Sequence, residues 1–413
     1  MASNPEFSLL LSLGLALFAA LAFSLLFSRI KQPVVIGQLV AGIIVGPFGL
    51  GLIQDLTIIN LLASLGIILL LFVVGLQLDL KEIRRIGGES LVLVIVELTV
   101  SFLSVFLVAL VVGLGYIESV FAGLLVSTTS TAIMGKILLE THSLKAREQH
   151  LVLTASIMED FATVFILLLL PGLVLADNQL PLADFGWLAV KGLLLLGLIF
   201  GFGWKIAPRI IDRVSYNDQE YKETAFLLAL SFGFMFALFS SYLGFSPAIG
   251  AFLMGLMISG KQAKFVLDKI GPVKDLFIVL FFVSMGTLIN IGSLISLTFP
   301  ILAVLATAIA GKFFGCWLGT RFSTSRQEAG RVGVSMLPRG EFSFIVAREG
   351  VGTGVAFQFL YPLAGLTTLL SSIIASVGLR LVKIKKREMI PIEVKASRKS
   401  RTTRQHHHET SHK

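Results

Sequence analysis

Cysteine and charge are both scarce in this sequence. One cysteine, Cys316, occurs among 413 residues, which excludes an internal disulfide and a thiolate-bound metal cluster. Only 14% of the residues are charged and 55% are hydrophobic, whereas an ordinary soluble domain has roughly 25% charged residues. The composition therefore excludes a disordered chain and an ordinary soluble enzyme, and it indicates a protein that crosses the membrane several times.

Histidine is missing from every long hydrophobic run. His142 and His150 lie in a polar turn, and the other four histidines follow residue 400. A zinc protease within the membrane or a histidine proton relay is therefore not expected, and no pair of nucleophile and base indicates an enzyme. No nucleotide-hydrolysing domain is visible and no cofactor is expected, so an ion gradient has to supply the energy for transport.

The hydrophobic residues form thirteen runs, most of them long enough to span a bilayer as a helix. The predicted spans are residues 7–28, 33–49, 57–78, 90–114, 117–140, 150–175, 185–207, 222–243, 246–260, 274–291, 293–320, 328–348 and 357–381. The first run lacks a basic flank and is too long for a cleaved signal peptide. We therefore predict an all-α integral membrane protein with thirteen transmembrane helices in residues 1–381, followed by a short basic cytoplasmic tail, 382–413.

The basic residues alternate between the two sides of this arrangement. All but four of the 34 lysines and arginines flank the ends of odd-numbered runs or lie near the C-terminus, the exceptions being Lys191, Lys312, Arg339 and Arg348. Because basic loops stay in the cytoplasm, we predict a multi-pass protein of the cell (plasma) membrane with its N-terminus outside and its C-terminus inside. The net charge of +9 then reflects topology, and the tail is expected to contact membrane lipid, not nucleic acid.

Two parts of the sequence resemble each other. Residues 36–42 align with residues 249–255 at an offset of 213, and Gly75 aligns with Gly286 at an offset of 211. Seven runs separate the members of each pair, so the two copies cross the membrane in opposite directions. Such inverted repeats are typical of secondary transporters, whose substrate site lies near mid-membrane between the repeats.

Two runs at corresponding places of this repeat are interrupted by polar residues. The fifth run contains five hydroxyl residues, 127–131, and the twelfth contains Pro338-Arg339-Gly340-Glu341. Proline removes a helical hydrogen bond, and Ser and Thr side chains compete for the backbone. Broken helices in both halves indicate a transport site; a proline kink and a packing seam of hydroxyl residues are the structural alternative.

Six ionisable residues fall at membrane depth, where each has an energetic cost: Glu97, Glu159, Asp160, Lys312, Arg339 and Glu341. Neighbours on a helix point about 100° apart, so Glu159 and Asp160 cannot have the same role. We expect Glu159 to meet Lys312, an ion pair that could be purely structural, while Asp160 faces an ion cavity and takes a proton or a cation.

The other membrane charges are assigned less directly. We favour a structural role for Arg339 and Glu341 beside the break at Pro338 over direct ion binding. Glu97 is expected to reach the membrane interface and has no assigned role.

Together the motifs resemble the monovalent cation/proton antiporter superfamily, in the branch of Kef-type potassium and NapA-type sodium antiporters. The resemblance extends from about Pro33 to Leu381 and is carried by "PVVIGQLVAGIIVGPFGLG", "STTSTAIMGKILLE", "ASIMEDFATVFILLLLP", "SPAIGAFLMGLMIS", "FFVSMGTLIN" and "LPRGEFSFIVA". It implies an NhaA-like fold with inverted five-helix repeats, in which a core with two crossed broken helices moves against a dimerisation domain of a homodimer.

The resemblance also implies roles for individual residues. Asp160 matches the aspartate that binds cation and proton, and Lys312 resembles the lysine that pairs with the preceding acid in electrogenic members. Glu159 occupies that preceding position here. NapA-like members have Asp at this position, Kef-like members have Gln and electroneutral relatives have Asn. The transported monovalent cation is therefore expected to bind to Asp160, Glu159, Thr129 and Ser130. The broken helices are expected to be supported by Thr131, Pro338, Arg339 and Glu341.

The sequence thus predicts a secondary active antiporter that exchanges Na⁺ or K⁺ for H⁺ and contributes to pH homeostasis. Its expected partners are these ions, membrane lipid and a second copy of the chain. A sodium-coupled symporter of an organic solute is the alternative, although few aromatic or amide groups lie near the breaks. A cation channel is a further alternative, which flux without proton movement would indicate.

Overall fold

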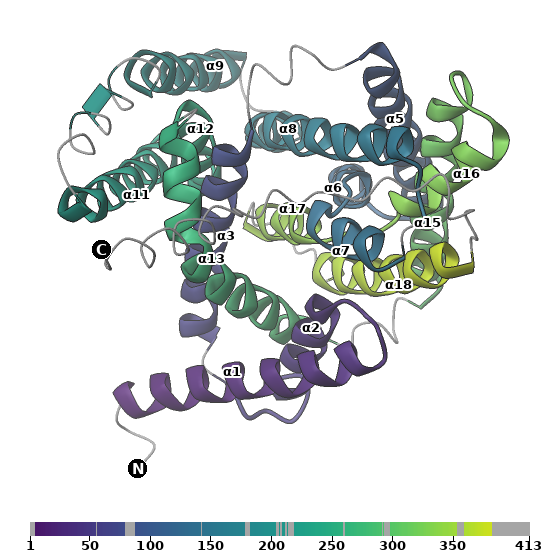
Figure 1. The fold of residues 1–413 in the computed structure, drawn as a ribbon, viewed down its shortest axis with the longest axis horizontal. Helices are drawn as coiled ribbons and strands as arrows, with labels where there is room; N and C mark the ends of the chain where they lie inside the picture. The colour runs from purple at the N-terminus through teal and green to yellow at the C-terminus, as the bar shows by residue number, and fades with distance from the viewer. Residues whose placement is uncertain are drawn as a thin grey trace, which may run out of the picture.

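The structure, a computed structural model, describes most of the chain. It covers residues 5–54, 56–78, 87–141, 143–177, 182–203, 219–258, 261–290, 298–352 and 359–381, with 206, 209, 210, 213 and 292 between them. Every regular element in these ranges is a helix. Figure 1 shows two groups of helices side by side, with α9 at one edge.

The first group, called the frame below, consists of two sets of three helices. They are α1 (Pro5–Arg29), α2 (Val34–Val45) and α3 (Leu56–Gln77), and α11 (Gln219–Tyr242), α12 (Pro247–Met257) and α13 (Lys261–Thr287). Helix α3 packs against α12 and α13, and α2 packs against α13. The two sets therefore interlock.

The second group, called the bundle below, contains the remaining long helices and four short ones. They are α5 (Gly88–Val111), α6 (Tyr116–Ser127), α7 (Thr131–Thr141), α8 (Ala146–Asp177), α15 (Thr298–Arg321), α16 (Arg326–Ser335), α17 (Glu341–Gly352) and α18 (Leu360–Leu381). Helices α5 and α15 pack closely against each other. Between bundle and frame in the chain lie α9 (Leu182–Leu198) and the π-helical turn η1 (Ile199–Gly203).

Each predicted hydrophobic run overlaps a helix or a pair of short helices. The fifth run consists of α6 and α7, and the twelfth of α16 and α17. Among the described residues, seven helical segments are long and apolar enough to cross a membrane, counting α6 and α7 together. Helix α13 begins at Lys261, not near residue 274, because the charged residues in its first half interrupt its hydropathy but not its helical hydrogen bonds. The predicted tail, 382–413, lies outside the described residues.

Glycines bring the frame helices into backbone contact. A Cβ added at Gly75 of α3 would lie 2.2 Å from the carbonyl oxygen of Phe252 on α12. A Cβ at Gly286 of α13 would lie 2.2 Å from the carbonyl oxygen of Leu39 on α2. In a lipid bilayer the hydrophobic effect does not drive helices together, so their association depends on close packing, which small residues allow.

These glycine contacts occur twice, at a nearly constant offset in the sequence. Gly75 contacts Phe252, and Gly286 contacts Leu39 in the same way. Gly286 lies 211 residues after Gly75, and Phe252 lies 213 residues after Leu39. The contact of Gly37 with the carbonyl oxygen of Phe23 recurs as that of Gly250 with Phe236. The two halves of the frame are therefore built alike, down to single backbone contacts.

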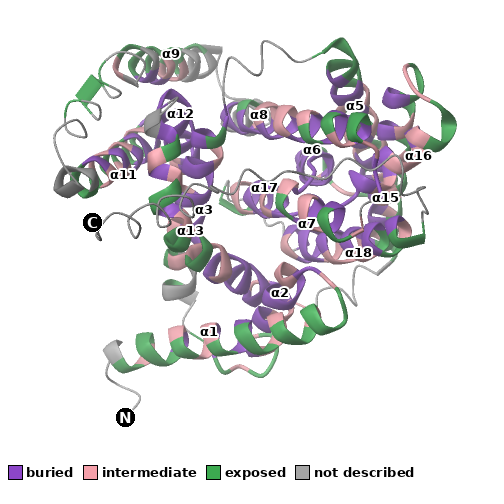
Figure 2. Cartoon of the chain, viewed as in Figure 1, coloured by how far each residue is buried: buried purple, intermediate pink, exposed green. Residues whose placement is uncertain are grey.

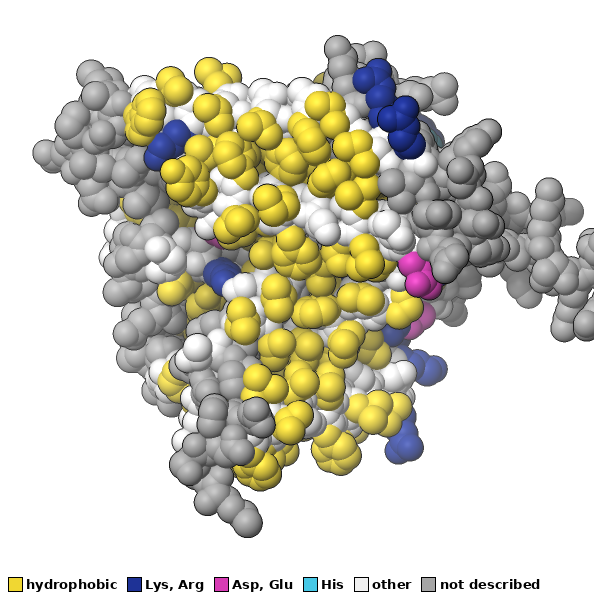
Figure 3. Space-filling view, turned by 90° about the vertical axis from the view of Figure 1, so that its left-hand side faces the viewer, with side chains coloured by type: hydrophobic (Ala, Val, Ile, Leu, Met, Phe, Trp, Pro, Cys, Tyr) yellow, Lys and Arg dark blue, Asp and Glu magenta, His cyan; other side chains and the backbone are white. Residues whose placement is uncertain are grey.

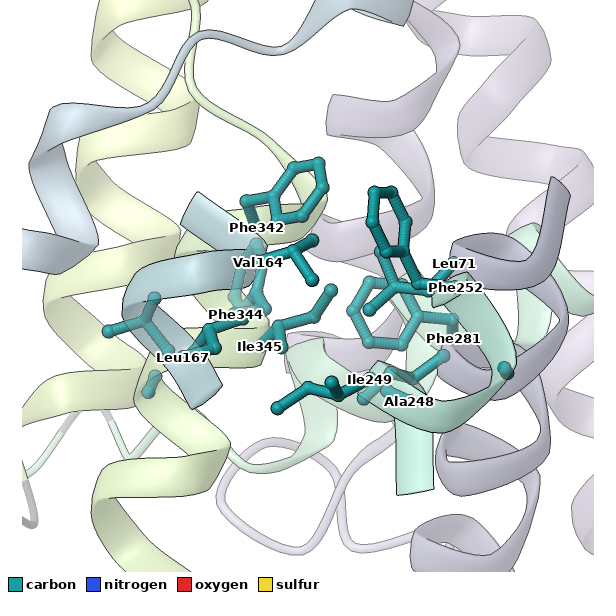
Figure 4. Packing of buried hydrophobic residues seen from close by; sticks show 14 of the residues in the cluster. Leu71, Val164, Leu167, Ala248, Ile249, Phe252, Phe281, Phe342, Phe344 and Ile345 are labelled. Carbon is teal, nitrogen blue, oxygen red and sulfur yellow. The ribbon is translucent and has the colours of Figure 1, made fainter. Parts of the chain in front are cut away.

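An apolar layer separates the frame from the bundle. Figure 4 shows Val164, Leu167, Phe344 and Ile345 of the bundle facing frame residues that include Phe252 and Phe281. Phe344 meets the rings of Phe281 and Phe282 edge-on, at centroid distances of 6.3 and 6.1 Å. Such contacts stabilise the packing of bundle against frame but depend little on one fixed position of the bundle relative to the frame.

Large hydrophobic side chains also cover the outside of the molecule. Phe18 on α1 is 72% exposed and Leu193 on α9 is 69% exposed. Figure 2 shows that α1, α9 and α11 carry many exposed residues, and Figure 3 shows a broad hydrophobic face with few charged side chains. An apolar surface of this extent is expected where helices contact lipid.

We predict that Gly75→Ala destabilises the protein by about 1–3 kcal/mol, because the new methyl group overpacks against backbone. Gly14→Ala is the matched control, since nothing lies within 4 Å of a Cβ at that position of α1. Thermal unfolding of both variants in detergent measures the difference. Equal melting temperatures would show that α3 and α12 are not in backbone contact.

Candidate ion site

Two broken helices cross at the centre of the bundle. Helix α6 ends at Ser127 and α7 begins at Thr131, while α16 ends at Ser335 and α17 begins at Glu341. The Ser130 amide donates a hydrogen bond to the Pro338 carbonyl, at 2.7 Å, and the Thr129 hydroxyl donates to the Met336 carbonyl, at 3.0 Å. The two breaks thus satisfy part of each other's freed backbone groups.

Side chains from α8 and α18 satisfy further amides of the breaks. The Thr129 amide donates to Oε2 of Glu159 on α8, at 2.9 Å, and the Arg339 amide donates to Oγ of Ser371 on α18, at 3.1 Å. Arg339 lies 210 residues after Thr129, and Ser371 lies 212 residues after Glu159, so the two contacts occupy corresponding positions of the repeat. The repeated architecture therefore extends from the frame into the bundle, with an acid in one half where the other has a serine.

Lys312 of α15 lies completely buried beside the first break. Its Nζ donates to Oε1 of Glu97, to the Ser127 carbonyl at 2.5 Å and to Oε2 of Glu159 at 3.1 Å. None of the three ionisable side chains is exposed to solvent. Two carboxylates therefore share one ammonium group in the interior.

The expectation that Glu97 reaches the membrane interface is wrong. Its side chain is 0% exposed and also accepts a hydrogen bond from the Ser101 hydroxyl, at 3.1 Å. A sequence signal for this position exists in α15, where Gly311, Gly315 and Gly319 follow a small-residue spacing typical of close helix pairs. A Cβ at Gly315 would lie 3.1 Å from Cα of Glu97, so this spacing seats Lys312 against α5.

Asp160 lines a cavity of about 360 Å³, and Lys312 does not. Its Oδ2 accepts a hydrogen bond from the Thr131 hydroxyl, at 3.2 Å, and its Oδ1 has no partner among the described residues. Ser130, Thr131 and Glu341 line the same cavity, and Glu159 does not. The Asp160 carboxylate therefore lines the cavity, while its buried Oδ1 has no hydrogen-bond partner among the described residues. The hydroxyl and carboxylate oxygens of the neighbouring lining residues suit a monovalent cation.

Arg339 and Glu341 occupy different places, although they are two residues apart. The Arg339 guanidinium is buried and donates to the carbonyl groups of Leu337, at 3.0 Å, and Ala308, at 3.3 Å. Glu341 accepts a hydrogen bond from the Ser130 hydroxyl, at 3.1 Å, and lies at the cavity. Arg339 thus binds the backbone around the second break, whereas Glu341 joins the two breaks at the cavity wall.

Polar contacts between bundle and frame lie away from the cavity. The Ser246 hydroxyl before α12 donates to Oε1 of Glu349 on α17, at 2.7 Å, and Arg348 donates to the Ser64 hydroxyl of α3. The sequence predicts no functional role for any of these four residues. The hydropathy of α17 does not distinguish Arg348 and Glu349 from their neighbours. Their partners, Ser64 and Ser246, lie in distant parts of the chain.

Comparison with known proteins gives consistent matches over most of the chain. A family model described as "sodium/hydrogen exchanger, transmembrane" matches residues 13–385. The Na(+)/H(+)-K(+) antiporter GerN of Bacillus cereus is 29% identical over 372 residues, which cover 89% of this chain and 95% of GerN. The glutathione-regulated potassium-efflux system protein KefC of Salmonella arizonae is 30% identical over 319 residues, which cover 76% of this chain and 50% of KefC.

A solved structure has a similar fold. It is that of the sodium proton antiporter MjNhaP1 from Methanocaldococcus jannaschii, with a TM-score of 0.69 and 20% sequence identity. The superposition covers 90% of this chain and 96% of MjNhaP1. The helical arrangement described above is therefore that of a known antiporter structure.

We predict that Lys312→Ala lowers the free energy of unfolding by about 3–5 kcal/mol, because it leaves buried carboxylates without a counter-charge. Arg147→Ala is the control, since it removes an exposed ion pair with Glu89 and should change stability little. Thermal unfolding in detergent measures both. Adding Glu97→Gln and Glu159→Gln to Lys312→Ala should recover part of the loss; no recovery would show that lost packing, not charge, is responsible.

Proposed function

The chain belongs to the transmembrane sodium/hydrogen exchanger family and is a cation/proton antiporter, and we propose that Asp160 is the group for which cation and proton compete. Members of this family transport ions and are not enzymes. The observation that carries the proposal is the Oδ1 atom of Asp160, which is without a partner among the described residues, in a carboxylate at the cavity wall. Protonation and cation binding at this group exclude each other, which enforces exchange.

We propose that Ser130, Thr131 and Glu341 complete the cation site. Hydroxyl and carboxylate oxygens at the cavity wall can replace part of the hydration shell of Na⁺ or K⁺. Glu159 acts beside this site, because it binds Lys312 and the Thr129 amide. Arg339 and Pro338 support the crossing of the broken helices from the opposite half.

We propose thirteen membrane crossings arranged as two inverted repeats of six elements, with α9 between them. The matching contacts of Gly37 and Gly250 support one more helix per repeat than the five that the family resemblance implies, because they involve α1 and α11. An odd number of crossings places the two chain ends on opposite sides. The distribution of basic residues supports an external N-terminus.

We propose that the bundle moves against the frame and that the structure has its ion cavity open toward the cytoplasm. Gln77 and Lys274 line the cavity, and both lie on the side that the basic loops assign to the cytoplasm. The contacts of Ser246 with Glu349 and of Arg348 with Ser64 then close the outer side. The apolar layer around Phe344 allows the bundle to slide between two such states.

The transported cation is proposed to be Na⁺ or K⁺, since the names of relatives include both ions. We propose a homodimer in the plasma membrane, surrounded by lipid at the exposed hydrophobic faces. Relatives named as antiporters favour exchange over the symport of an organic solute, and coupled proton movement separates exchange from a channel.

Asp160→Asn is expected to abolish exchange, because the amide can neither release a proton nor neutralise a cation. Liposomes containing the protein and an internal pH dye report proton movement when Na⁺ or K⁺ is added. Asp268→Asn is the matched control, since that aspartate is exposed on α13 and does not line the cavity, and it should retain wild-type rates. Robust exchange by Asp160→Asn would refute the assignment.

Competition at Asp160 also predicts how exchange depends on pH. At any pH low enough for Asp160 to be mostly protonated, lowering the pH further on the cation side should raise the apparent KM by up to about tenfold per pH unit, because each cation must displace a proton. The maximal rate at saturating cation should change less. An apparent KM independent of pH over this range would contradict competition at one group.

A further inference from the structure

We propose that Glu97 is a positioning residue that keeps Lys312 charged throughout the transport cycle, so that one proton is exchanged for each cation. The inference rests on the antiport function proposed above and deepens it by giving its stoichiometry. It concerns a buried acid that the exchange reaction at Asp160 does not itself use.

The surroundings of Lys312 match a charged ammonium group. An ammonium carries three N–H donors and no acceptor, and three acceptors surround Nζ, from Glu97, Ser127 and Glu159. A neutral amine would have two donors and would turn its lone pair toward one of these oxygens. Loss of the proton would therefore leave a buried acceptor unpaired and two acids without a counter-charge.

Glu97 makes this charge independent of Glu159. Glu159 is adjacent to Asp160, so a cation bound at Asp160 can draw the Glu159 carboxylate away from Lys312. Glu97 cannot follow, because it lies on α5, where Ser101 binds its carboxylate and Gly315 packs against its backbone. Lys312 then still has one carboxylate and the Ser127 carbonyl, and it keeps its proton.

The cavity gives protons access to Asp160 but not to Lys312. Glu97, Glu159 and Lys312 are each 0% exposed, and none of them lines the cavity. The other charged groups at the cavity wall are Glu341 on α17 and Lys274 on α13. Glu341 and Lys274 carry opposite charges when both are ionised, so their charges cancel. Asp160 is then the group at the cavity wall that binds a proton and a cation in turn.

The exchange step then conserves charge. The O–H bond of protonated Asp160 breaks, the proton passes to water in the cavity, and the cation binds the remaining carboxylate. Asp160 carries one positive ion in each direction, and Lys312 keeps its charge in both. A complete cycle therefore moves no net charge across the membrane.

The test is the pH gradient at which flux stops. The full chain is reconstituted in liposomes with an internal pH dye and a tenfold cation gradient, and the voltage is set with an ionophore for an ion that the protein does not carry. One proton per cation balances this gradient at about one pH unit, at any voltage, whereas two protons balance it at about half a unit without voltage. We expect the first result; a balance near half a unit that shifts with voltage would overturn the proposal.

Variants assign the result to Glu97. In Glu97→Gln, Lys312 depends on Glu159 alone, and we expect the balance point to move toward half a unit and to shift with voltage. Glu89→Gln, an exposed acid on the same helix, should keep the wild-type balance. The balance point is independent of the amount of folded protein, so destabilisation alone cannot move it. An unchanged balance in Glu97→Gln would overturn the role of Glu97.

Two further outcomes are separated by the same measurements. If wild-type protein moves two protons and Glu341→Gln restores one, the second proton belongs to Glu341 and the proposal is overturned. If neither Na⁺ nor K⁺ moves protons in the wild type, the antiport function itself fails, independently of its stoichiometry.

Discussion

The hydrogen bonds of Lys312 are the constraint on which the bundle depends. A lysine without solvent needs three acceptors and a counter-charge, and the acceptors come from α5, from the end of α6 and from α8. Satisfying one ammonium therefore fixes the position of three helices around α15. It also holds Glu159 away from the cavity, so the next residue, Asp160, lines the cavity. The ion site is in this sense a consequence of how a neighbouring charge is buried.

The broken helices follow the same rule of complete hydrogen bonding. Interrupting a helix inside a membrane exposes amides and carbonyls that have no water to bind. Here the two interruptions bind each other through Ser130 and Pro338, and side chains of α8 and α18 bind two further amides. The Glu159 contact and the Ser371 contact are equivalent by the repeat, but only one carries charge. The repeat thus supplies the geometry, and a difference between its halves supplies the chemistry.

Some of this arrangement is visible in the sequence and some is not. Hydropathy locates the helices, and proline and consecutive hydroxyl residues locate the two breaks, because these features are local. The adjacency of Glu159 and Asp160 predicts that they face different ways, for the same reason. The burial of Glu97, the turn of Glu341 toward the cavity and the contact of Ser246 with Glu349 depend on how distant helices are rotated about their axes. Long apolar helices have nearly uniform hydrophobicity around their circumference, so hydropathy alone does not fix that rotation.

The apolar layer between frame and bundle has a pharmacological consequence. Contacts such as that of Phe344 with Phe281 and Phe282 involve no hydrogen bond that sliding would break, so within this layer the resistance to movement comes from the fit of the surfaces. A lipophilic molecule that inserts beside these rings would wedge the two bodies in one position. It would stop transport without occupying the ion site, and a higher cation concentration would not displace it. Inhibitors of this kind would be recognised by shape, and they would reach their site through the lipid.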